Sequence, residues 1–361
     1  NKKKNSIKPY HYRSINVNNF IMKVLLFDTT NAFLTPGGKT THALKLQQEL
    51  EKLGVNIEFA RWWDKSQDDC DIIHFLAPVP HIAKLAKGKG MKTFLSLIFD
   101  YESNKPLKEQ KKTIFKNRII DKLPGVLSSN AYWKSFPFMD KIQFMHEYDK
   151  NTALKYFPKY IDEDKVLIIP HAFDPSDMNI SNGLNITELN FPKKYLISCA
   201  NISERKQSLL LAKYAKKAQV PIVFLGSSTL TDLYFIRFQK EIDNQFVFYP
   251  GYVSREWKDC IESHASGYVL LSQGESGCIA VYEAAAYNMP LLLSNLPWAW
   301  GYDSPTDIYF CDYNNEDKAI QQLGDFYTKA HKLNHPPFKI QTWHEIAEMY
   351  LLQYKKILEC H

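Results

Sequence analysis

Apolar residues along the chain form short runs that alternate with segments of helical periodicity. In the first half, four apolar runs have the length of buried strands, at residues 22–28, 71–77, 92–98 and 166–169. Between the first two runs, Leu44, Leu46, Leu50 and Leu53 mark an amphipathic helix, and Gly54 stands where a helix ends. Strands that alternate with helices predict a parallel sheet.

The same alternation starts again after residues 174–193, which are rich in Asn, Ser, Pro and Asp and are typical of a linker. Five more strands are predicted at 195–200, 221–226, 246–249, 268–272 and 291–294, with helices at 206–217, 230–242, 256–263 and 277–287. The sequence therefore predicts an α/β fold with two Rossmann-like parallel-sheet domains, 22–173 and 174–342. Ligands bind beyond the carboxyl ends of such strands, so we expect the active site in a cleft where the two sheets face each other.

Charge is unevenly distributed along the 361 residues, whose net charge is +6. Residues 1–21 carry five basic side chains and no acidic one. We expect them to form a basic, flexible N-terminal tail, with a natural start at Met22 as the alternative. The remainder has 40 basic and 39 acidic side chains, a balance that argues against a nucleic-acid binder.

No apolar run reaches the roughly 18 residues that span a membrane, and the start of the chain lacks the apolar core of a signal peptide. The six cysteines form no CxxC pair. We expect them to be buried free thiols and not disulfides or zinc ligands. This indicates a reducing compartment such as the cytoplasm.

Two short motifs carry the chemistry of anion binding. Gly37-Gly38 stands between the first strand and the first helix, where glycine lets the backbone approach a phosphate at the positive end of a helix, although a simple tight turn has the same pattern. Arg205 and Lys206 follow a predicted strand and open a predicted helix. Two cations at this place can neutralise a departing diphosphate, or they lie on a solvated helix start.

Glu275 and Glu283 are the most informative pair of acidic residues. On a helix, eight residues at about 100° each return close to the starting face, so both carboxylates are expected to face one pocket. The backbone amides of Ser276 and Gly277 would lie between them at a helix start. Carboxylates accept hydrogen bonds from sugar and ribose hydroxyls. Glu283 has apolar and small neighbours, which favours a ligand or a buried partner over a solvated position.

These residues resemble glycosyltransferase family four, the retaining GT-B enzymes. The family pattern of Glu, seven residues and Glu is present as Glu275 and Glu283, followed by Ala284-Ala285-Ala286 and the Pro-led strand 290–292. The family's Gly-Gly-x3-His loop is matched by residues 37–42, its hinge by 169–174, and its closing helix by 342–347 and the apolar periodicity that follows. The resemblance covers roughly residues 22–358.

The resemblance implies a role for each candidate residue. It implies that Gly38 and Lys206 contact the donor diphosphate, that Glu283 binds the ribose, that Glu275, Ser276 and Gly277 hold the donor sugar and its phosphate, and that Val253 meets the base. Gly37, Thr40 and His171 are candidates on the acceptor side, in the N-terminal domain. The resemblance also implies that the helix 343–358 crosses back onto that domain and that 174–342 binds the donor.

The chain departs from the family pattern at three places. Asn288 stands where the family has Gly before the Pro-led strand, and Asn tolerates the same left-handed backbone. Ala200-Asn201 stand where the family usually has Gly-Arg, which makes Arg205 a candidate for the missing cation. Phe99-Asp100 stand in place of His-Asp, so Asp100 is the ionisable group at that position and joins Glu275 as a catalytic candidate.

Two alternative signals concern metals and histidines. Asp69-Cys70-Asp71 matches the Asp-x-Asp pattern of metal-dependent glycosyltransferases, but the tripeptide is common by chance and Asp71 opens a predicted strand. We therefore expect neither metal nor other cofactor. His42 and His74, and likewise His81, are interpreted as packing or helix-start residues.

Residues 105–122 carry seven basic and two acidic side chains, interleaved with apolar ones. This pattern is typical of a solvated helix face or of a patch that meets an anionic membrane surface.

The sequence as a whole predicts a retaining, metal-independent transferase that moves a sugar from a UDP- or GDP-sugar to a glycan or lipid-linked acceptor in surface polysaccharide or glycoconjugate synthesis. The predicted location is the cytoplasm, either free in it or attached peripherally to the inner face of the membrane. The lost arginine and histidine leave two alternatives open: a nucleotide-sugar binding protein without transfer, and a sugar-nucleotide epimerase.

Overall fold

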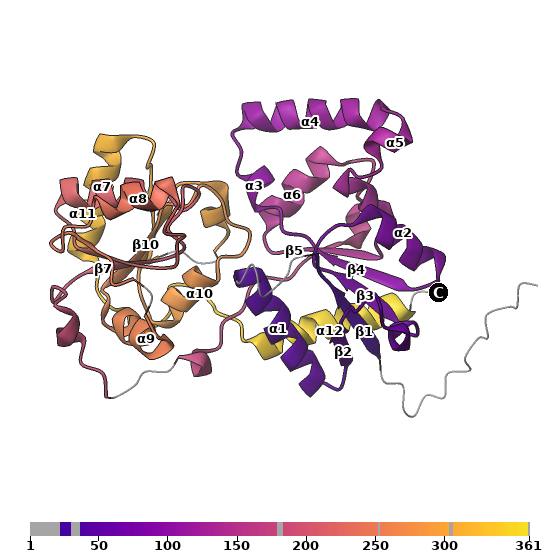
Figure 1. Cartoon of the computed structure of the whole chain (residues 1–361), viewed down its shortest axis with the longest axis horizontal. Coiled ribbons are helices and arrows are strands. Elements are labelled where there is room, and N and C mark those ends of the chain that lie inside the picture. Colours follow the sequence, from indigo (N-terminus) through magenta and orange to yellow (C-terminus); the bar gives the residue numbers. More distant parts are fainter. Residues whose placement is uncertain (1–21, 30–36, 179–182, 252, 303–305, 360–361) are drawn as a thin grey trace, which may run out of the picture.

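The computed structural model describes residues 22–29, 37–178, 183–251, 253–302 and 306–359. The predicted basic tail, residues 1–21, lies outside these ranges. The described chain forms two lobes, and each lobe is built around one six-stranded sheet (Figure 1). Neighbouring strands run parallel in both sheets, which confirms the predicted two-domain α/β fold.

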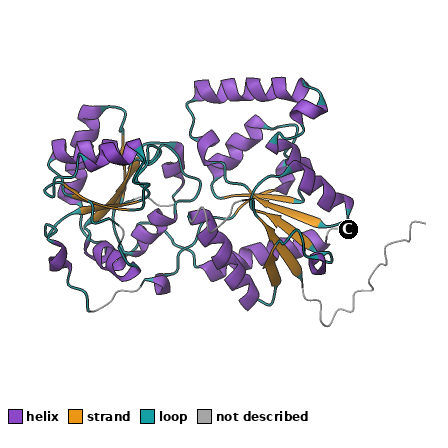
Figure 2. Cartoon of the chain, in the orientation of Figure 1, coloured by secondary structure: helices purple, strands orange, loops and turns teal. Residues whose placement is uncertain are grey.

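The first lobe has the strand order β2-β1-β3-β4-β5-β6, with helices around the sheet (Figure 2). Its strands are β1 (Lys23–Phe27), β2 (Asn56–Phe59), β3 (Ile72–Phe75), β4 (Lys92–Ser96), β5 (Lys141–Phe144) and β6 (Val166–Ile168). Its helices are α1 (Gly38–Lys52), α2 (Pro80–Gly88), α3 (Asp100–Ser103), α4 (Leu107–Lys122), α5 (Gly125–Ser128) and α6 (Glu147–Tyr156). Short 3-10 turns lie at Lys65–Gln67, Tyr132–Phe138 and Glu163–Lys165.

The second lobe has the order β12-β11-β10-β7-β8-β9. Its strands are β7 (Leu196–Cys199), β8 (Ile222–Leu225), β9 (Val247–Phe248), β10 (Gly267–Leu270), β11 (Leu291–Ser294) and β12 (Ile308–Cys311). Its helices are α7 (Ser208–Ala218), α8 (Leu233–Gln239), α9 (Arg255–His264), α10 (Ile279–Ala286) and α11 (Glu316–Lys329). Three 3-10 turns lie at Pro175–Asp177, Ile186–Leu189 and Pro297–Gly301.

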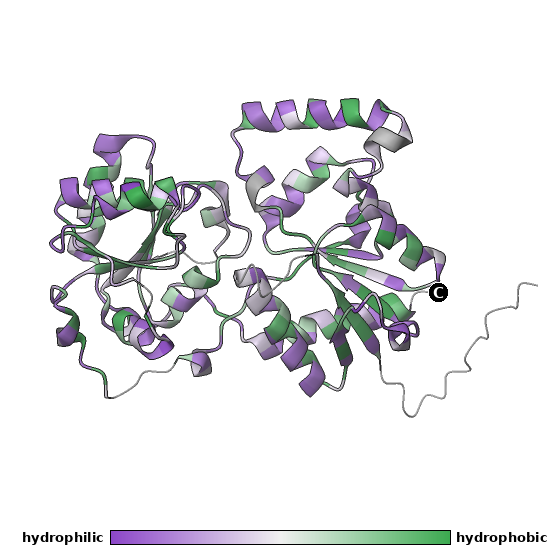
Figure 3. Ribbon diagram, viewed as in Figure 1, coloured by the Kyte–Doolittle hydropathy of each residue, from purple (hydrophilic) through white to green (hydrophobic). Residues whose placement is uncertain are grey.

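The strands form where the apolar runs are, because a parallel sheet covered on both faces buries every residue of its central strands. All four residues are buried in each of β8, β10 and β11. Figure 3 shows this as hydrophobic strands at the centre of each lobe, with hydrophilic residues on the outer helices.

The last helix, α12 (Trp343–Glu359), leaves the second lobe and packs against α1 and β4 of the first lobe (Figure 1). Its buried face includes Trp343, Tyr350 and Tyr354, which join the core that also contains Val24 and Leu26 of β1. The chain therefore crosses between the lobes a second time, so that both ends of the described chain belong to the first lobe.

Three strands, β2, β5 and β12, were not predicted. β2 is a four-residue edge strand that contains Glu58, and β5 contains the buried Gln143, so neither gives a simple apolar run. The five described cysteines are free, and four of them are buried, while Cys199 is partly exposed. Cys360 lies outside the described residues. No helix in the described part of the chain is both long and apolar enough to cross a lipid bilayer.

Candidate functional site

A cleft of about 810 Å³ lies between the two lobes. The first lobe contributes Gly37, Gly38, Lys39 and Lys45, and the second contributes Arg205, Lys206, Arg255, Lys258, Glu275 and Glu283. A smaller pocket of about 90 Å³ shares Gly38, Lys39, Glu275 and Gly277 with the cleft. We call this smaller space the inner pocket; its other lining residues include His42 and His171.

Two helix N-termini approach each other at this cleft. Gly37 precedes the first residue of α1, Gly38, and a Cβ added to Gly38 would lie 3.5 Å from Cδ1 of Ile279, the first residue of α10. Thr40 lies in the first turn of α1 and is partly buried. The unpaired backbone N–H groups of a helix start carry partial positive charge, so the junction of α1 and α10 favours an anion.

Glu275 is the centre of a buried ion-pair cluster. Its Oε1 accepts hydrogen bonds from Lys206 Nζ at 2.5 Å and Arg205 Nη1 at 3.0 Å, and from the Ser272 hydroxyl at 2.5 Å. Burial alone would raise the pKa of Glu275, but Lys206 and Arg205 outweigh it and the net effect is a lowered pKa. Burial would likewise lower the pKa of Lys206, but Cys278 and Glu275 raise it. Both charges therefore persist inside the protein.

The prediction that Arg205 and Lys206 open a helix is wrong. The helix α7 begins at Ser208, and Gln207 before it has a left-handed backbone with φ of 54°. The two cations lie in the preceding turn, where Gln273 N–H donates to the carbonyl of Arg205 at 2.8 Å. This turn directs their side chains toward Glu275 instead of along a helix face.

The helical spacing assumed for Glu275 and Glu283 is also wrong, because α10 begins only at Ile279 and Glu275 lies in the loop before it. Both residues nevertheless line the cleft. The loop and the helix therefore bring to one cleft the two carboxylates that the sequence had placed on one helix face. Ser276 and Gly277 also lie in the loop, before the first residue of α10.

Glu283 belongs to a second charged cluster, which also lines the cleft. Lys258 Nζ pairs with Glu283 and lies 3.3 Å from Glu262, and Arg255 Nη2 lies 3.5 Å from Glu283. Burial and the neighbouring carboxylate of Glu283 together raise the pKa of Glu262 to about 8. Burial opposes the charge of Lys258, but Cys199, Glu262 and Glu283 raise its pKa.

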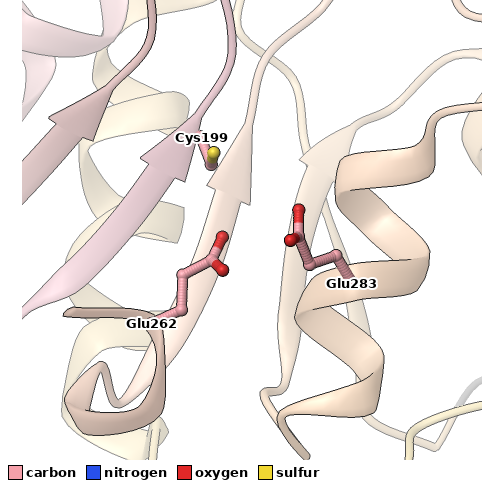
Figure 4. A group of neighbouring side chains, drawn as sticks. All are labelled: Cys199, Glu262 and Glu283. Atoms are coloured by element: carbon pink, nitrogen blue, oxygen red, sulfur yellow. The ribbon is translucent and has the colours of Figure 1, made fainter. Parts of the chain in front are cut away.

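Figure 4 shows Cys199, Glu262 and Glu283, whose ligand atoms lie within 4.8 Å of one another, a spacing that a metal ion accepts. Two observations count against a metal here. Lys258 already provides a cation to both carboxylates, and burial raises the pKa of Cys199 well above its usual value, which keeps it a thiol. A thiolate is the form that binds metals.

The Asp-x-Asp segment has structural partners. Asp69 accepts from Lys23 Nζ at 2.5 Å, and Asp71 Oδ2 accepts from the backbone N–H of Lys23 at 2.8 Å. Both carboxylates thus tie the start of β1 to the loop before β3.

The lobes contact each other directly beside the inner pocket. The Ser276 hydroxyl donates to Asp149 Oδ2 of α6 at 2.7 Å, and Asp149 is 2% exposed. A Cβ added to Gly277 would lie 2.2 Å from Met145 Sδ and 3.2 Å from His171 Cδ2, so a side chain here would require Met145 to move. The loop that follows Glu275 is therefore held against the first lobe.

The other candidate residues are placed as follows. Val253 lies in the loop before α9, partly buried against the core of the second lobe. Asp100 is the first residue of α3, but its side chain lies outside the described residues. Phe99 is buried against Tyr156 and Phe157.

Sequence reasoning missed several residues of the site, among them Asp149, Arg255, Lys258 and Glu262. Lys258 and Glu262 stand one helical turn apart on α9, a spacing that by itself indicates an ordinary surface ion pair. Only the position of α10 next to α9 shows that this pair is buried and faces Glu283.

No family model and no curated protein sequence matches the chain. Solved structures do. Sucrose-phosphate synthase from Thermosynechococcus elongatus has a TM-score of 0.68 at 12% identity, over 94% of this chain and 100% of that one. Anabaena HepE in complex with UDP and glucose has a TM-score of 0.62 at 10% identity, over 93% of this chain and 100% of that one. AviGT4, a glycosyltransferase involved in avilamycin A biosynthesis, has a TM-score of 0.59 at 15% identity, over 94% of this chain and 99% of that one. These likenesses establish the GT-B fold.

Proposed function

We propose that the protein is a retaining glycosyltransferase of family four that moves a sugar from a UDP- or GDP-sugar to a glycan or lipid-linked acceptor. The observation that carries the proposal is the distribution of charge in the cleft. Glu283 is paired with Arg255 and Lys258, and these three residues line the same cleft as Lys206, Arg205 and the N-termini of α1 and α10. A nucleoside diphosphate has a matching arrangement of ribose hydroxyls and phosphates.

Each part of the cleft then has a role. Glu283 accepts hydrogen bonds from the ribose hydroxyls, and Val253 contacts the base. The diphosphate lies at the N-termini of α1 and α10 near Lys206 and Arg205, which neutralise its charge as it leaves and make a metal unnecessary. The same fold in Anabaena HepE was solved with UDP and glucose, which supports a nucleotide-sugar donor.

The transfer step has a simple balance. The bond between the anomeric carbon and the diphosphate oxygen breaks while a bond to the acceptor oxygen forms on the same face of the sugar. The acceptor proton passes to the leaving diphosphate, so configuration is retained. Glu275, held ionised by Lys206 and Arg205, lies at the sugar end of the diphosphate. Asp100 remains the candidate for contact with the acceptor.

The burial of Phe99 favours the alternative of a protein that binds a nucleotide-sugar without transfer, because this position contributes no polar group to the cleft. Release of UDP from UDP-glucose, measured with and without glycan acceptors, separates the two. Tight binding without turnover would select the alternative.

Calorimetry with UDP and GDP tests the donor site directly. A hydrogen bond to a charged group contributes about 1.5–3 kcal/mol, so Glu283→Ala should weaken nucleotide binding about 10- to 150-fold. Glu163→Ala, which alters an exposed glutamate of the first lobe, is the control and should bind as the unaltered protein does. Unchanged affinity in folded Glu283→Ala would remove the ribose assignment.

A membrane surface is the proposed site of the acceptor, and α4 is the element that would meet it. This helix lies along the outer end of the first lobe (Figure 1). It buries Gln110 and Asn117 yet exposes Phe115 and Ile119, which are 67% and 48% exposed. An ordinary surface helix has the opposite pattern. The apolar outer side chains are accompanied by exposed lysines and an arginine, a combination that fits an anionic lipid surface.

Vesicle sedimentation tests this surface. The protein from Met22 onward should bind anionic vesicles and not neutral ones, and added salt should release it, because the attraction decays within about 8 Å at physiological ionic strength. Reversal of Lys111, Lys112 and Lys116 to Glu should abolish binding.

The control for these reversals is the same charge change at three exposed lysines elsewhere, Lys240, Lys355 and Lys356. If both triple variants lose vesicle binding equally, net charge and not α4 is responsible. If the unaltered protein ignores anionic vesicles at low salt, α4 is only a solvated face.

A further inference from the structure

We propose that His42 and His171 form a donor–acceptor pair that binds one sugar hydroxyl in the inner pocket, with His42 Nδ1 as hydrogen-bond acceptor and His171 Nε2–H as donor. The inference rests on the proposed function and adds a hydroxyl-binding site to it. The sequence had marked His42 as a packing residue, and both rings are indeed buried, at 4% and 2% exposure. Their hydrogen bonds, however, leave one nitrogen of each ring available.

The proton on His42 is fixed by a chain of hydrogen bonds. Gln143 donates through Nε2 to the carbonyl of Ile169 at 2.7 Å, which turns its Oε1 toward Tyr350. The Tyr350 hydroxyl donates to that oxygen at 3.1 Å. Its oxygen also lies 3.2 Å from Ser96 Oγ and 3.5 Å from His42 Nε2. With its single proton directed to Gln143, the hydroxyl accepts from both, which assigns the ring proton of His42 to Nε2.

His42 Nδ1 therefore carries a lone pair. Among the residues that the structure describes, no group donates to this atom, although it is buried. An unpaired acceptor inside a protein is costly, which makes a hydroxyl donor from a ligand its natural partner. The ring lines the inner pocket, where such a ligand would lie.

His171 has the opposite arrangement. Its Nδ1 accepts from the backbone N–H of Ala172 at 2.8 Å, so the ring proton is on Nε2. The ring lines the same pocket, and its centroid is 5.2 Å from that of His42. Burial lowers the pKa of both rings, that of His42 to about 4, so both are neutral and keep these complementary roles.

A hydroxyl is the group that satisfies both rings, because it donates one hydrogen bond and accepts others. The inner pocket adjoins Glu275 and the backbone of Ser276 and Gly277, at the end of the cleft where the sugar of a bound nucleotide-sugar would lie. The hydroxyl belongs either to the donor sugar or to an acceptor sugar, and binding measurements distinguish the two.

Amide substitutions test each nitrogen separately. The Asn side-chain oxygen lies where His Nδ1 does, and the Gln amide nitrogen lies near His Nε2. His42→Asn and His171→Gln therefore keep the proposed groups, whereas His42→Gln and His171→Asn lose them. Affinities for UDP and GDP, for their glucose, galactose and mannose conjugates, and for the free sugars are measured by calorimetry on folded variants.

A neutral hydrogen bond predicts that the two losing variants bind the sugar about 3- to 10-fold more weakly, with bare UDP or GDP unaffected. Weaker binding of the conjugates assigns the hydroxyl to the donor sugar. Weaker binding of free sugar to the nucleotide-saturated protein assigns it to an acceptor.

The variants that keep the proposed groups, His42→Asn and His171→Gln, and those that lose them can also bind both the conjugates and the free sugars equally. That result overturns the histidine pair while the proposed function stands. If the unaltered protein binds neither UDP nor GDP, the proposed function fails, and free-sugar binding then decides on the histidines by itself.

Discussion

Replacement of Glu262 by Gln should stabilise the protein at high pH and leave it unchanged at low pH. Around α9, the carboxylates of Asp259, Glu262 and Glu283 lie beside the cations of Arg255 and Lys258. Lys332 Nζ also donates to the backbone carbonyl of Glu262 at 3.0 Å. Glu262 is the less exposed of the two glutamates, at 1%. Its pKa is accordingly raised from 4.5 to about 8 by burial and by Glu283.

The sign follows from proton binding. Between pH 4.5 and 8 the folded protein keeps the proton of Glu262 and the unfolded chain has lost it, so the free energy of unfolding falls as pH rises through this window. At about 1.4 kcal/mol per pKa unit, the loss is on the order of 5 kcal/mol. Glu262→Gln removes the titrating group, so the variant should match the unaltered protein near pH 5 and exceed it by up to that amount above pH 8.

Urea unfolding followed by circular dichroism at a series of pH values between 5 and 9 measures this difference. Glu163→Gln, at an exposed glutamate, serves as the control and should show no pH-dependent difference. A stability difference for Glu262→Gln that is constant across the series, or that has the opposite sign above pH 8, would refute the raised pKa of Glu262 as the source of the pH dependence.

Three further predictions concern the cleft and the backbone behind it. Glu275→Ala should abolish transfer but weaken binding of bare UDP only mildly, by calorimetry; equal loss of both would place Glu275 elsewhere. Activity should survive EDTA because Lys206 and its neighbouring arginine neutralise the leaving group, and loss that manganese restores would revive a metal mechanism. Gly226→Ala should destabilise by about 3 kcal/mol in urea unfolding, because its Cβ would lie 2.0 Å from the carbonyl of Ala200 at φ of 154°. Gly90→Ala, also at positive φ but in open space, should cost only about 1 kcal/mol.

The two-sheet fold could be predicted from the sequence because strand burial is a local property. The run that became β8 is apolar throughout, and β1 and β11 each carry only one polar residue, at an end, since both faces of a parallel sheet are covered. The left-handed backbone at Asn288, with φ of 54°, was likewise readable from one residue type. β5, which carries the buried Gln143, was missed, and so was β12, although its four residues are apolar.

The site was predictable only as far as single residues carry it. The sequence by itself marked Gly38, Lys206, Glu275 and Glu283 as charged or glycine positions near strand ends, although it placed Lys206 and Glu275 on helices that begin only after them. It did not determine which charges pair, because pairing depends on distances between elements far apart in the chain. Lys258 became the partner of Glu283 only when α9 packed beside α10.

The same holds for the histidines. His42 reads as an ordinary residue of an amphipathic helix, and its ring is given a proton position only by Tyr350 of α12, 308 residues later in the chain. Hydrogen bonds between such distant residues form after the last helix has crossed back to the first lobe. The sequence therefore determined the elements and their charges, while tertiary packing decided which nitrogen, carboxylate and cation face each other, because these contacts depend on the closure of the whole chain.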